Sequence, residues 1–265
     1  MEKELWTALG VIFIFLMTTA GSSLVFFFKK DLSSNFKRIF LGFASGIMIA
    51  ASIFSLIIPA IETPVDYMPS WAVVGIAFLL GCLFLFAIDK LVPHIHKGMN
   101  EEEGIKTKRL KSSTKMFLAV LIHNIPEGLA VGLAFGLVFS GQGDSEALLI
   151  SALMLALGMG LQNFPEGAAV SLPLMEEFKS KPKAFLYGTL TGIVEPVAAV
   201  VGIFLSMYIS GIMPWALAFA AGCMVYVTVE ELIPESQMDS KNHFGTWSFI
   251  VGFVVMMVLD IALAF

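Results

Sequence analysis

Eight stretches of this 265-residue chain are each long and apolar enough to cross a membrane as one helix. A helix needs about 20 apolar residues to span the hydrocarbon core of a bilayer, which is about 30 Å thick. Strands of a membrane barrel would alternate polar and apolar residues over about ten positions, and these runs do not alternate. The sequence therefore predicts an all-α integral membrane protein with eight transmembrane helices in one domain, residues 1–265. The predicted spans are residues 5–28, 39–60, 71–92, 116–139, 147–175, 184–209, 215–235 and 244–265.

The composition excludes a soluble domain. The chain is 57% hydrophobic and 14% charged, with a mean hydropathy of +0.86, whereas soluble domains carry about 25% charged residues. The bilayer is thus the expected partner, and no nucleic-acid partner is expected. The cysteines, Cys82 and Cys223, each stand alone in an apolar run, so neither a disulfide framework nor a thiolate metal cluster is expected. The first apolar run is too long for a cleavable signal peptide.

Basic residues predict the orientation. Every lysine and arginine except Lys3 falls in the first, third, fifth or seventh connection, with Lys37 and Arg38 counted in the first. Basic residues favour the cytoplasmic side, so these connections are predicted to be cytoplasmic and both termini extracytoplasmic. The third connection, residues 93–115, is the longest. The fourth and fifth spans then run antiparallel, as in the inverted repeats of many transporters.

One polar motif occurs in both of these spans. HNIPEG begins at His123, and QNFPEG begins at Gln162. His123 and Glu127 are four residues apart and share a helix face, as do Gln162 and Glu166. The proline in each motif predicts a kink that frees backbone carbonyls. Taken singly, a proline in a membrane helix most often only kinks the helix, and an amide side chain often only hydrogen-bonds to a neighbouring helix.

Several glutamates in the spans constrain the function more strongly than the prolines and amides do. Glu127, Glu166 and Glu195 lie well inside predicted spans, and the seventh span ends EELIPE, with Glu230 and Glu231 inside it. A charge at the centre of a bilayer costs about 2.5–3.5 kcal/mol even on the lenient insertion scale. The span interiors contain no lysine or arginine to pair with these acids. Protons, metal cations, or both in exchange remain as partners.

The histidine of the first motif narrows the choice of metal ion. Imidazole mixed with carboxylate and amide suits zinc, iron(II), manganese or a mimic such as cadmium better than calcium or magnesium. Zinc prefers four ligands in a tetrahedron, which His123, Glu127, Gln162 and Glu166 could supply. Because this set contains no cysteine, it favours passage of the ion over permanent capture.

The motifs together resemble those of the ZIP (Zrt/Irt-like) divalent-metal transporters. The resemblance rests on HNIPEG, QNFPEG, the VEP at residues 194–196 and the EELIPE at residues 230–235, in this order. Glutamine rather than histidine at position 162 is similar to the GufA-type branch. The resemblance implies an eight-helix inverted-repeat bundle with no enzymatic activity and no organic cofactor. It also implies Zn²⁺ as the transported substrate, with Cd²⁺, Fe²⁺ or Mn²⁺ as further candidate substrates.

The resemblance also implies a two-metal centre between the fourth, fifth and sixth spans. One site would use His123, Glu127, Gln162 and Glu166, and Met48 matches a family methionine near it. The second site would use Asn124, Asn163 and Glu195, with Glu127 and Glu166 bridging. Some members carry aspartate where this chain has Asn163, so the second site here has one charge fewer.

The family further implies that spans one, four, five and six move as a bundle against the others, often in a homodimer. Inward transport rests on the resemblance alone, and the compact chain suggests a bacterial plasma membrane. Two other functions remain open from the residues. The carboxylates could serve a proton-linked exchanger of another substrate, or Glu127 or Glu166 could be the general base of an intramembrane metallohydrolase.

Other polar residues admit two interpretations each. His94 and His96, followed by Glu101, Glu102 and Glu103, form either an ordinary solvated loop or a weak metal site. Glu230, Glu231 and Glu235 form either an exit path toward the cytoplasm or a pH-sensitive cap. Asp89 and Asp260 stand at span ends, where an interfacial position accounts for them.

Overall fold

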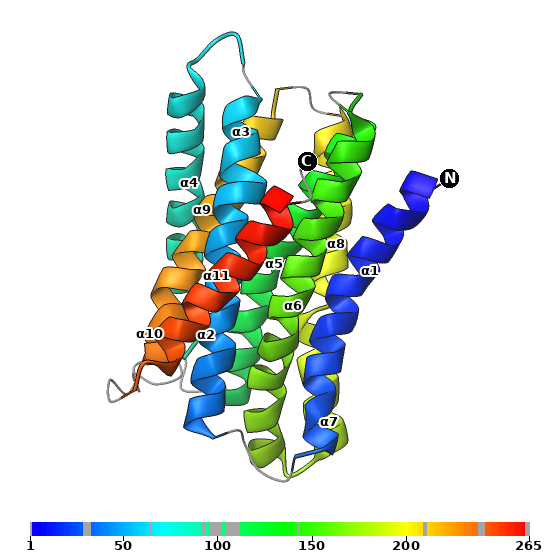
Figure 1. Ribbon diagram of the computed structural model, residues 1–265. Helices are drawn as coiled ribbons and strands as arrows, with labels where there is room; N and C mark the ends of the chain where they lie inside the picture. Colours follow the sequence, from blue (N-terminus) through cyan, green and yellow to red (C-terminus); the bar gives the residue numbers. More distant parts are fainter. Residues whose placement is uncertain are drawn as a thin grey trace.

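The computed structural model describes residues 2–28, 33–63, 65–91, 94–95, 102–103, 112–141, 144–208, 211–237 and 242–262. Within these residues, eight helical segments are long and apolar enough to cross a membrane, which confirms the predicted all-α membrane architecture (Figure 1). The two ends of the chain lie toward the same end of the bundle. The segments are Glu2–Phe26, Ser34–Glu62, Ser70–Ile88, Val120–Phe139, Ser145–Phe178, Lys181–Met207, Met213–Gln237 and Phe244–Ala262.

Five spans are built on one long α-helix each. They are α1 (Glu2–Ser22, continued by the 3₁₀ turn η1, Ser23–Phe26), α4 (Ser70–Leu91), α5 (Ser112–Phe139), α6 (Ser145–Phe178) and α11 (Phe244–Ala262). Both α5 and α6 continue as helices through the prolines of their motifs. The polar motifs are therefore held in regular helix, so the side-chain spacing read from the sequence applies to the structure.

The sixth span, predicted over residues 184–209, is found over Lys181–Met207, where a break separates two helices. Helix α7 (Lys181–Thr191) ends and α8 (Val194–Tyr208) begins after Gly192 and Ile193. Pro196 explains the break, because it has no N–H to donate to the carbonyl of Gly192 four residues earlier. A proline is tolerated in the first turn of a helix, so the chain restarts as α8. The N-terminus of α8 thus lies inside the span.

Spans two and seven each contain a wide, π-helical turn. Helix α2 (Ser34–Ala51) passes through η2 (Ser52–Ile57) into α3 (Ile58–Glu62), which contains Pro59. In span seven, α9 (Met213–Val227), η3 (Thr228–Leu232) and α10 (Ile233–Gln237) follow one another, with Pro234 in α10. A proline clashes with the carbonyl of the preceding turn, and a π-turn relieves the clash. The sequence analysis did not predict these turns.

Close backbone contacts join the helices in four pairs: α1 with α6, α5 with α8, α2 with α11, and α4 with α9. In each pair a glycine leaves no room for a β-carbon, which would collide with a carbonyl oxygen of the partner helix. Small residues allow membrane helices to approach this closely. The contacts join Gly167 to Thr18, Gly132 to Ala199, Gly46 to Phe249, and Gly222 to Phe78.

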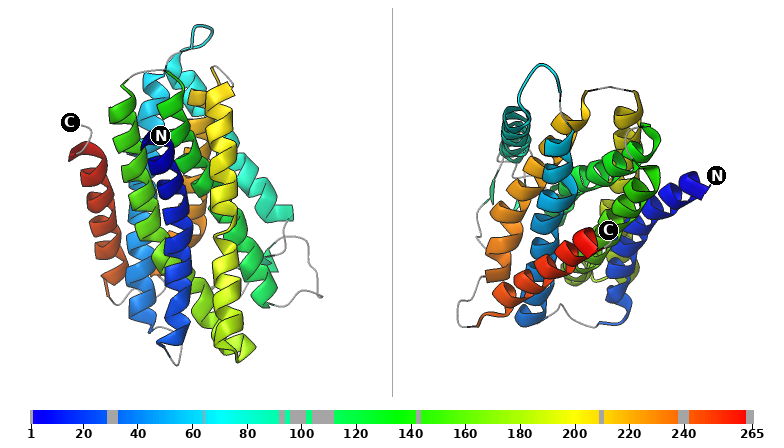
Figure 2. Two further views of the ribbon diagram at one scale, coloured as in Figure 1. Left: turned by 90° about the vertical axis from the view of Figure 1, so that its right-hand side faces the viewer. Right: turned by 45° about the horizontal axis from the view of Figure 1, so that its top comes forward.

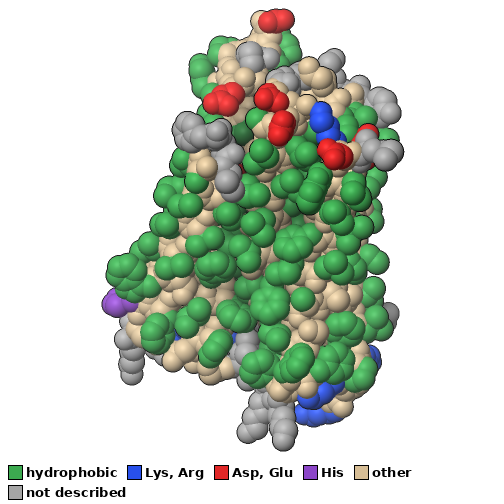
Figure 3. Space-filling model, turned by 45° about the vertical axis from the view of Figure 1, so that its right-hand side comes forward, with side chains coloured by type: hydrophobic (Ala, Val, Ile, Leu, Met, Phe, Trp, Pro, Cys, Tyr) green, Lys and Arg blue, Asp and Glu red, His purple; other side chains and the backbone are tan. Residues whose placement is uncertain are grey.

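The face drawn in Figure 3 is apolar between two charged ends. Exposed side chains such as Leu83 and Trp247 face outward from their helices, as expected where the surroundings are lipid. Figure 2 shows the helices running side by side through this apolar band. Helix α2 begins before the predicted span, so Arg38 is helical and buried, and its Nη1 donates to Asn242 Oδ1 at 3.4 Å.

Two short strands pair in the connection after α4. Strand β1 (His94–Ile95) pairs antiparallel with β2 (Glu102–Glu103), with His94 opposite Glu103. His96 and Glu101 lie outside the described residues.

Candidate metal centre

The two polar motifs meet inside the bundle. Helices α5 and α6 pack against each other, and α8 packs along α5. The polar side chains of the two motifs and the glutamate of α8 are buried, except that Glu166 is half-buried. The predicted residues brought together are His123, Asn124, Glu127, Gln162, Asn163, Glu166 and Glu195. All of them except His123 fall into two hydrogen-bonded clusters.

In the first cluster one amide joins two carboxylates. Gln162 Nε2 donates to Glu127 Oε1 at 3.0 Å and to Glu166 Oε2 at 2.6 Å. Gln162 and Glu166 are one helical turn apart on α6, whereas Glu127 belongs to α5. Hydrogen bonds to charged acceptors are stronger than neutral ones. The amide NH₂ group therefore occupies the position between the carboxylates that a cation would also favour.

In the second cluster three side chains donate to one carboxylate. Thr18 Oγ1 and Asn124 Nδ2 donate to Glu195 Oε1 at 2.9 and 3.0 Å, and Asn163 Nδ2 donates to Glu195 Oε2 at 2.7 Å. Glu195 lies in the first turn of α8, where the positive end of the helix dipole stabilises a negative charge. The break at Gly192 produces this helix end, so the fold places the positive end of a helix dipole next to a buried carboxylate.

Backbone carbonyls hold the two asparagines in place. Asn124 Nδ2 also donates to the carbonyl of Thr191 at 3.2 Å, and Asn163 Nδ2 donates to that of Ile14 at 3.4 Å. Both amide nitrogens are thereby directed at oxygen acceptors. Their side-chain oxygens face away from these acceptors.

Four buried oxygens of the two clusters have no hydrogen-bond donor: Asn124 Oδ1, Asn163 Oδ1, Glu127 Oε2 and Gln162 Oε1. A buried polar atom without a partner costs about 1–3 kcal/mol. Oxygens accept hydrogen bonds or bind cations, so each of these atoms suits a cation or a protonated group. Among the described residues, however, no three His, Cys, Asp and Glu side chains converge as a metal cluster. The amides separate the carboxylates.

His123 faces a different helix from its motif partners. Its Nε2 lies 3.1 Å from Glu231 Oε1, and Glu231 belongs to the π-turn η3 of span seven. In the same region, Thr228 Oγ1 donates to the sulfur of Met48 at 3.6 Å. Met48 is buried on α2. The imidazole and the thioether are thus both in contact with the π-turn η3 of span seven.

Comparison with known proteins identifies the relatives of this chain. The family described as "ZIP Zinc transporter" matches residues 4–116 and 100–260. The chain belongs to the ZIP zinc transporter family. It is 35% identical to the human protein named zinc transporter ZIP11, with 96% of each chain covered. It is also 33% identical to zinc transporter ZupT of Streptococcus mutans, with 97% and 98% covered.

A third relative is informative about which branch of the ZIP family the chain resembles. The chain is 37% identical to the Myxococcus xanthus protein named zinc transporter GufA, with 79% of this chain and 80% of the relative covered. This confirms the resemblance to the ZIP family with GufA-like relatives. Because the family is one of transporters, membership also supports the prediction that the chain is not an enzyme.

Other predicted residues lie outside the two clusters of this ZIP chain. Glu230 and Glu235 are half-buried on η3 and α10. His94 is in β1, and His96 lies outside the described residues. Asp260, near the end of α11, accepts from Ser55 Oγ of the π-turn η2 at 2.8 and 2.9 Å.

The sequence analysis missed Thr18 of α1. Thr18 is buried, and it donates to Glu195 across 177 positions of sequence. The available signal was the run TTAGSS at residues 18–23, which is unusually polar for a membrane span. A polar side chain at that depth needs a partner, but the sequence does not identify which one.

Proposed function

We propose that this chain carries zinc, or a related divalent transition metal, across the membrane through the two clusters between α5, α6 and α8. One observation supports this most strongly. Two inverted motifs bury the carboxylates of Glu127, Glu166 and Glu195, and in the described part of the chain no lysine or arginine pairs with them. Buried carboxylates of this kind need protons or metal cations.

Zinc is proposed because of the chemistry of the donors and because of the relatives. Imidazole, carboxylate and amide oxygens together suit zinc, with cadmium, iron(II) and manganese as further candidates. The family and the three relatives described above carry the name zinc transporter. A proton-linked exchanger of another substrate is the alternative, and it would not require zinc for turnover.

We propose two adjacent metal positions. The first would use His123, Glu127, Gln162 and Glu166. The side-chain amide of Gln162 would turn so that Oε1 rather than Nε2 faces the ion, since the two ends of an amide are interchangeable in shape. The second position would use Asn124, Asn163 and Glu195 with the bridging carboxylates, again through amide oxygens.

The glycine contacts support a division into two bodies. The pairs α1–α6 and α5–α8 carry both clusters, and the pairs α2–α11 and α4–α9 form the rest. We propose that the first body moves against the second to expose the metal to each side in turn, and that transport runs toward the cytoplasm. We further propose a homodimer in a plasma membrane, with bacterial origin suggested by the short connections.

Zinc uptake into sealed proteoliposomes tests the proposal. The intact chain should show saturable uptake, and Glu127→Ala combined with Glu166→Ala should abolish it, because both proposed metal positions lose their shared carboxylates. Glu176→Ala combined with Glu177→Ala is the matched control, since these glutamates lie exposed at the end of α6. Equal uptake by the intact chain and the Glu127/Glu166 variant would refute a carrier that holds zinc at these motifs.

A further inference from the structure

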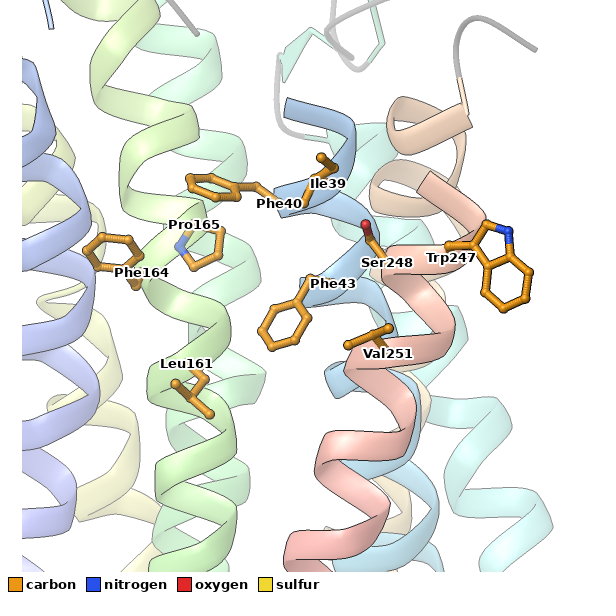
Figure 4. Close-up of a pocket in the computed structure, with 9 residues that line it drawn as sticks. All are labelled: Ile39, Phe40, Phe43, Leu161, Phe164, Pro165, Trp247, Ser248 and Val251. Carbon is orange, nitrogen blue, oxygen red and sulfur yellow. The ribbon is translucent and has the colours of Figure 1, made fainter. Parts of the chain in front are cut away.

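A groove opens on the outside of the bundle behind the metal clusters (Figure 4). Its volume is about 450 Å³, within the range of sites that bind small apolar ligands. Three helices line it: α2, α6 and α11. The lining residues are Ile39, Phe40 and Phe43 from α2, Leu161, Phe164 and Pro165 from α6, and Trp247, Ser248 and Val251 from α11.

The groove is continuous with the lipid-facing surface. Trp247 is 65% exposed, Val251 52% and Ile39 37%. In Figure 4, Phe40 and Phe43 point from α2 toward the residues of α6, whereas Trp247 lies at the outer rim. Ser248 is the one polar side chain among the lining residues, and none of them is charged. Such a wall favours a flexible hydrocarbon chain over a peptide or a polar solute.

One end of the groove lies near the membrane surface and is basic. Ile39 and Trp247 are within about two turns of the starts of α2 and α11. The turn of α2 that precedes Ile39 carries Lys37, which is half-buried, whereas the neighbouring Arg38 is buried and donates to Asn242. Basic residues at this level attract anionic headgroups, and a tryptophan at this level is typical of a membrane–water interface. The charge and the aromatic rim together match an anionic phospholipid.

We propose that the groove binds one acyl chain of an anionic phospholipid, with its headgroup at the Lys37 and Arg38 end. A second copy of the chain fits less well. The tightly packed α2–α11 pair is joined through Gly46 and Gly252, and the groove lies where α6 meets this pair. A narrow recess between helices admits a chain of methylenes more readily than a flat helix face of a partner.

The occupant would contact both bodies of the carrier. Leu161, Phe164 and Pro165 share two turns of α6 with Gln162, Asn163 and Glu166, which face the metal clusters. An acyl chain between these apolar residues and α2 must rearrange whenever α6 moves against α2 and α11. Lipid bound in the groove therefore sets the rate of transport, a consequence that rests on the proposed carrier function.

Photolabelling tests the binding directly. The full chain is reconstituted in phosphatidylcholine vesicles that contain a little phosphatidylglycerol with a diazirine in one acyl chain, and labelled peptides are mapped by mass spectrometry. Label is expected on the groove residues Phe43, Phe164 and Val251, above the level at Leu83, which is exposed outside the groove. Unlabelled phosphatidylglycerol should compete better than phosphatidylcholine. Labelling of the groove no higher than at Leu83 overturns the proposal, as does equal competition by the two lipids.

A variant that fills the groove gives a second test. Each methylene buried contributes about a factor of four to affinity, so Ser248→Trp should lower the groove labelling at least about tenfold. Val254→Trp is the control, because Val254 is exposed on α11 outside the groove. Both variants should still bind zinc in equilibrium dialysis, which verifies folding, and Ser248→Trp alone should change the rate of zinc uptake.

The outcomes separate the two proposals. Labelling requires neither zinc nor flux, so its failure overturns the lipid site and leaves the carrier untouched. Absence of zinc flux from the intact chain overturns the carrier and leaves the labelling result standing. Crosslinks between two copies at Val251, with no lipid adduct there, would assign the groove to a dimer contact and overturn the lipid site. The wild-type labelling map decides the matter even if Ser248→Trp fails to fold.

Discussion

Replacing Asn163 by aspartate should destabilise the metal-free protein. Asn163 Nδ2 donates to Glu195 Oε2 at 2.7 Å, and the substitution places an oxygen there instead. A hydrogen bond to a charged group contributes about 1.5–3 kcal/mol. Two unit charges about 4 Å apart repel by about 4 kcal/mol at an effective dielectric of 20, unless one carboxylate takes up a proton. We expect a loss of about 2–4 kcal/mol in the free energy of unfolding at pH 7.5 without metal.

Zinc should restore this loss, because the added carboxylate is also a metal ligand. A ligand at a hundred times its dissociation constant stabilises the native state by about 2.7 kcal/mol. The assay is thermal unfolding of the purified protein at pH 7.5 with a chelator or with zinc. With about 2–4 °C per kcal/mol for a chain of this size, the chelated Asn163→Asp variant should melt about 4–16 °C below the parent, and zinc should raise its melting temperature more than that of the parent.

Asn163→Leu separates the two effects. Leucine removes the donor to Glu195 but adds no charge, so this variant should lose stability without a larger response to zinc. The reasoning fails if Asn163→Asp is as stable as the parent in chelator. It fails equally if zinc stabilises the aspartate and leucine variants to the same extent.

Three further predictions follow from the same contacts. Metal binding should weaken as the pH falls from 7.5 to 5, because protons compete for the carboxylate and imidazole lone pairs; equilibrium dialysis showing constant affinity would contradict it. His123→Ala should shift preference away from zinc toward manganese in competition uptake assays, because the remaining donors are all oxygens, and an unchanged preference would exclude His123 as a ligand. Gly132→Ala should lower the melting temperature markedly, since its β-carbon would collide with the carbonyl of Ala199. Gly75→Ala, which meets nothing within 4 Å, should be neutral or stabilising by up to about 1 kcal/mol; equal effects of the two would refute the close-contact argument.

The sequence predicted the spans and the two motifs because membrane insertion constrains each residue locally. A charge in a span costs free energy wherever the neighbouring helices lie, so Glu127, Glu166 and Glu195 stand out without a structure. The grouping of these glutamates with the amides in one two-metal centre was implied by the resemblance to ZIP transporters, not by the cost of burial. The structure brings these residues together as two hydrogen-bonded clusters.

The remaining features depend on contacts between distant segments. The spacing of His123 and Glu127 places them on one helix face, but it does not show that His123 also reaches Glu231 on span seven. The π-turns next to Pro59 and Pro234 and the break before Pro196 have a visible signal in the prolines. A proline alone does not tell whether a helix kinks, widens or stops, because the packing around it selects among these outcomes.

Amides would allow the proposed metal site to be stable both with and without a cation. Gln162 donates to Glu127 and Glu166, and Asn124 and Asn163 donate to Glu195. If these donors were carboxylates, an empty site would hold too many negative charges in a membrane interior to persist without protons. An amide presents its nitrogen to a carboxylate when the site is empty and its oxygen to a metal when the site is filled. A carrier must return empty in every cycle, so amides alternating with carboxylates suit turnover better than a fully anionic cage, which would hold its ion more tightly and release it more slowly.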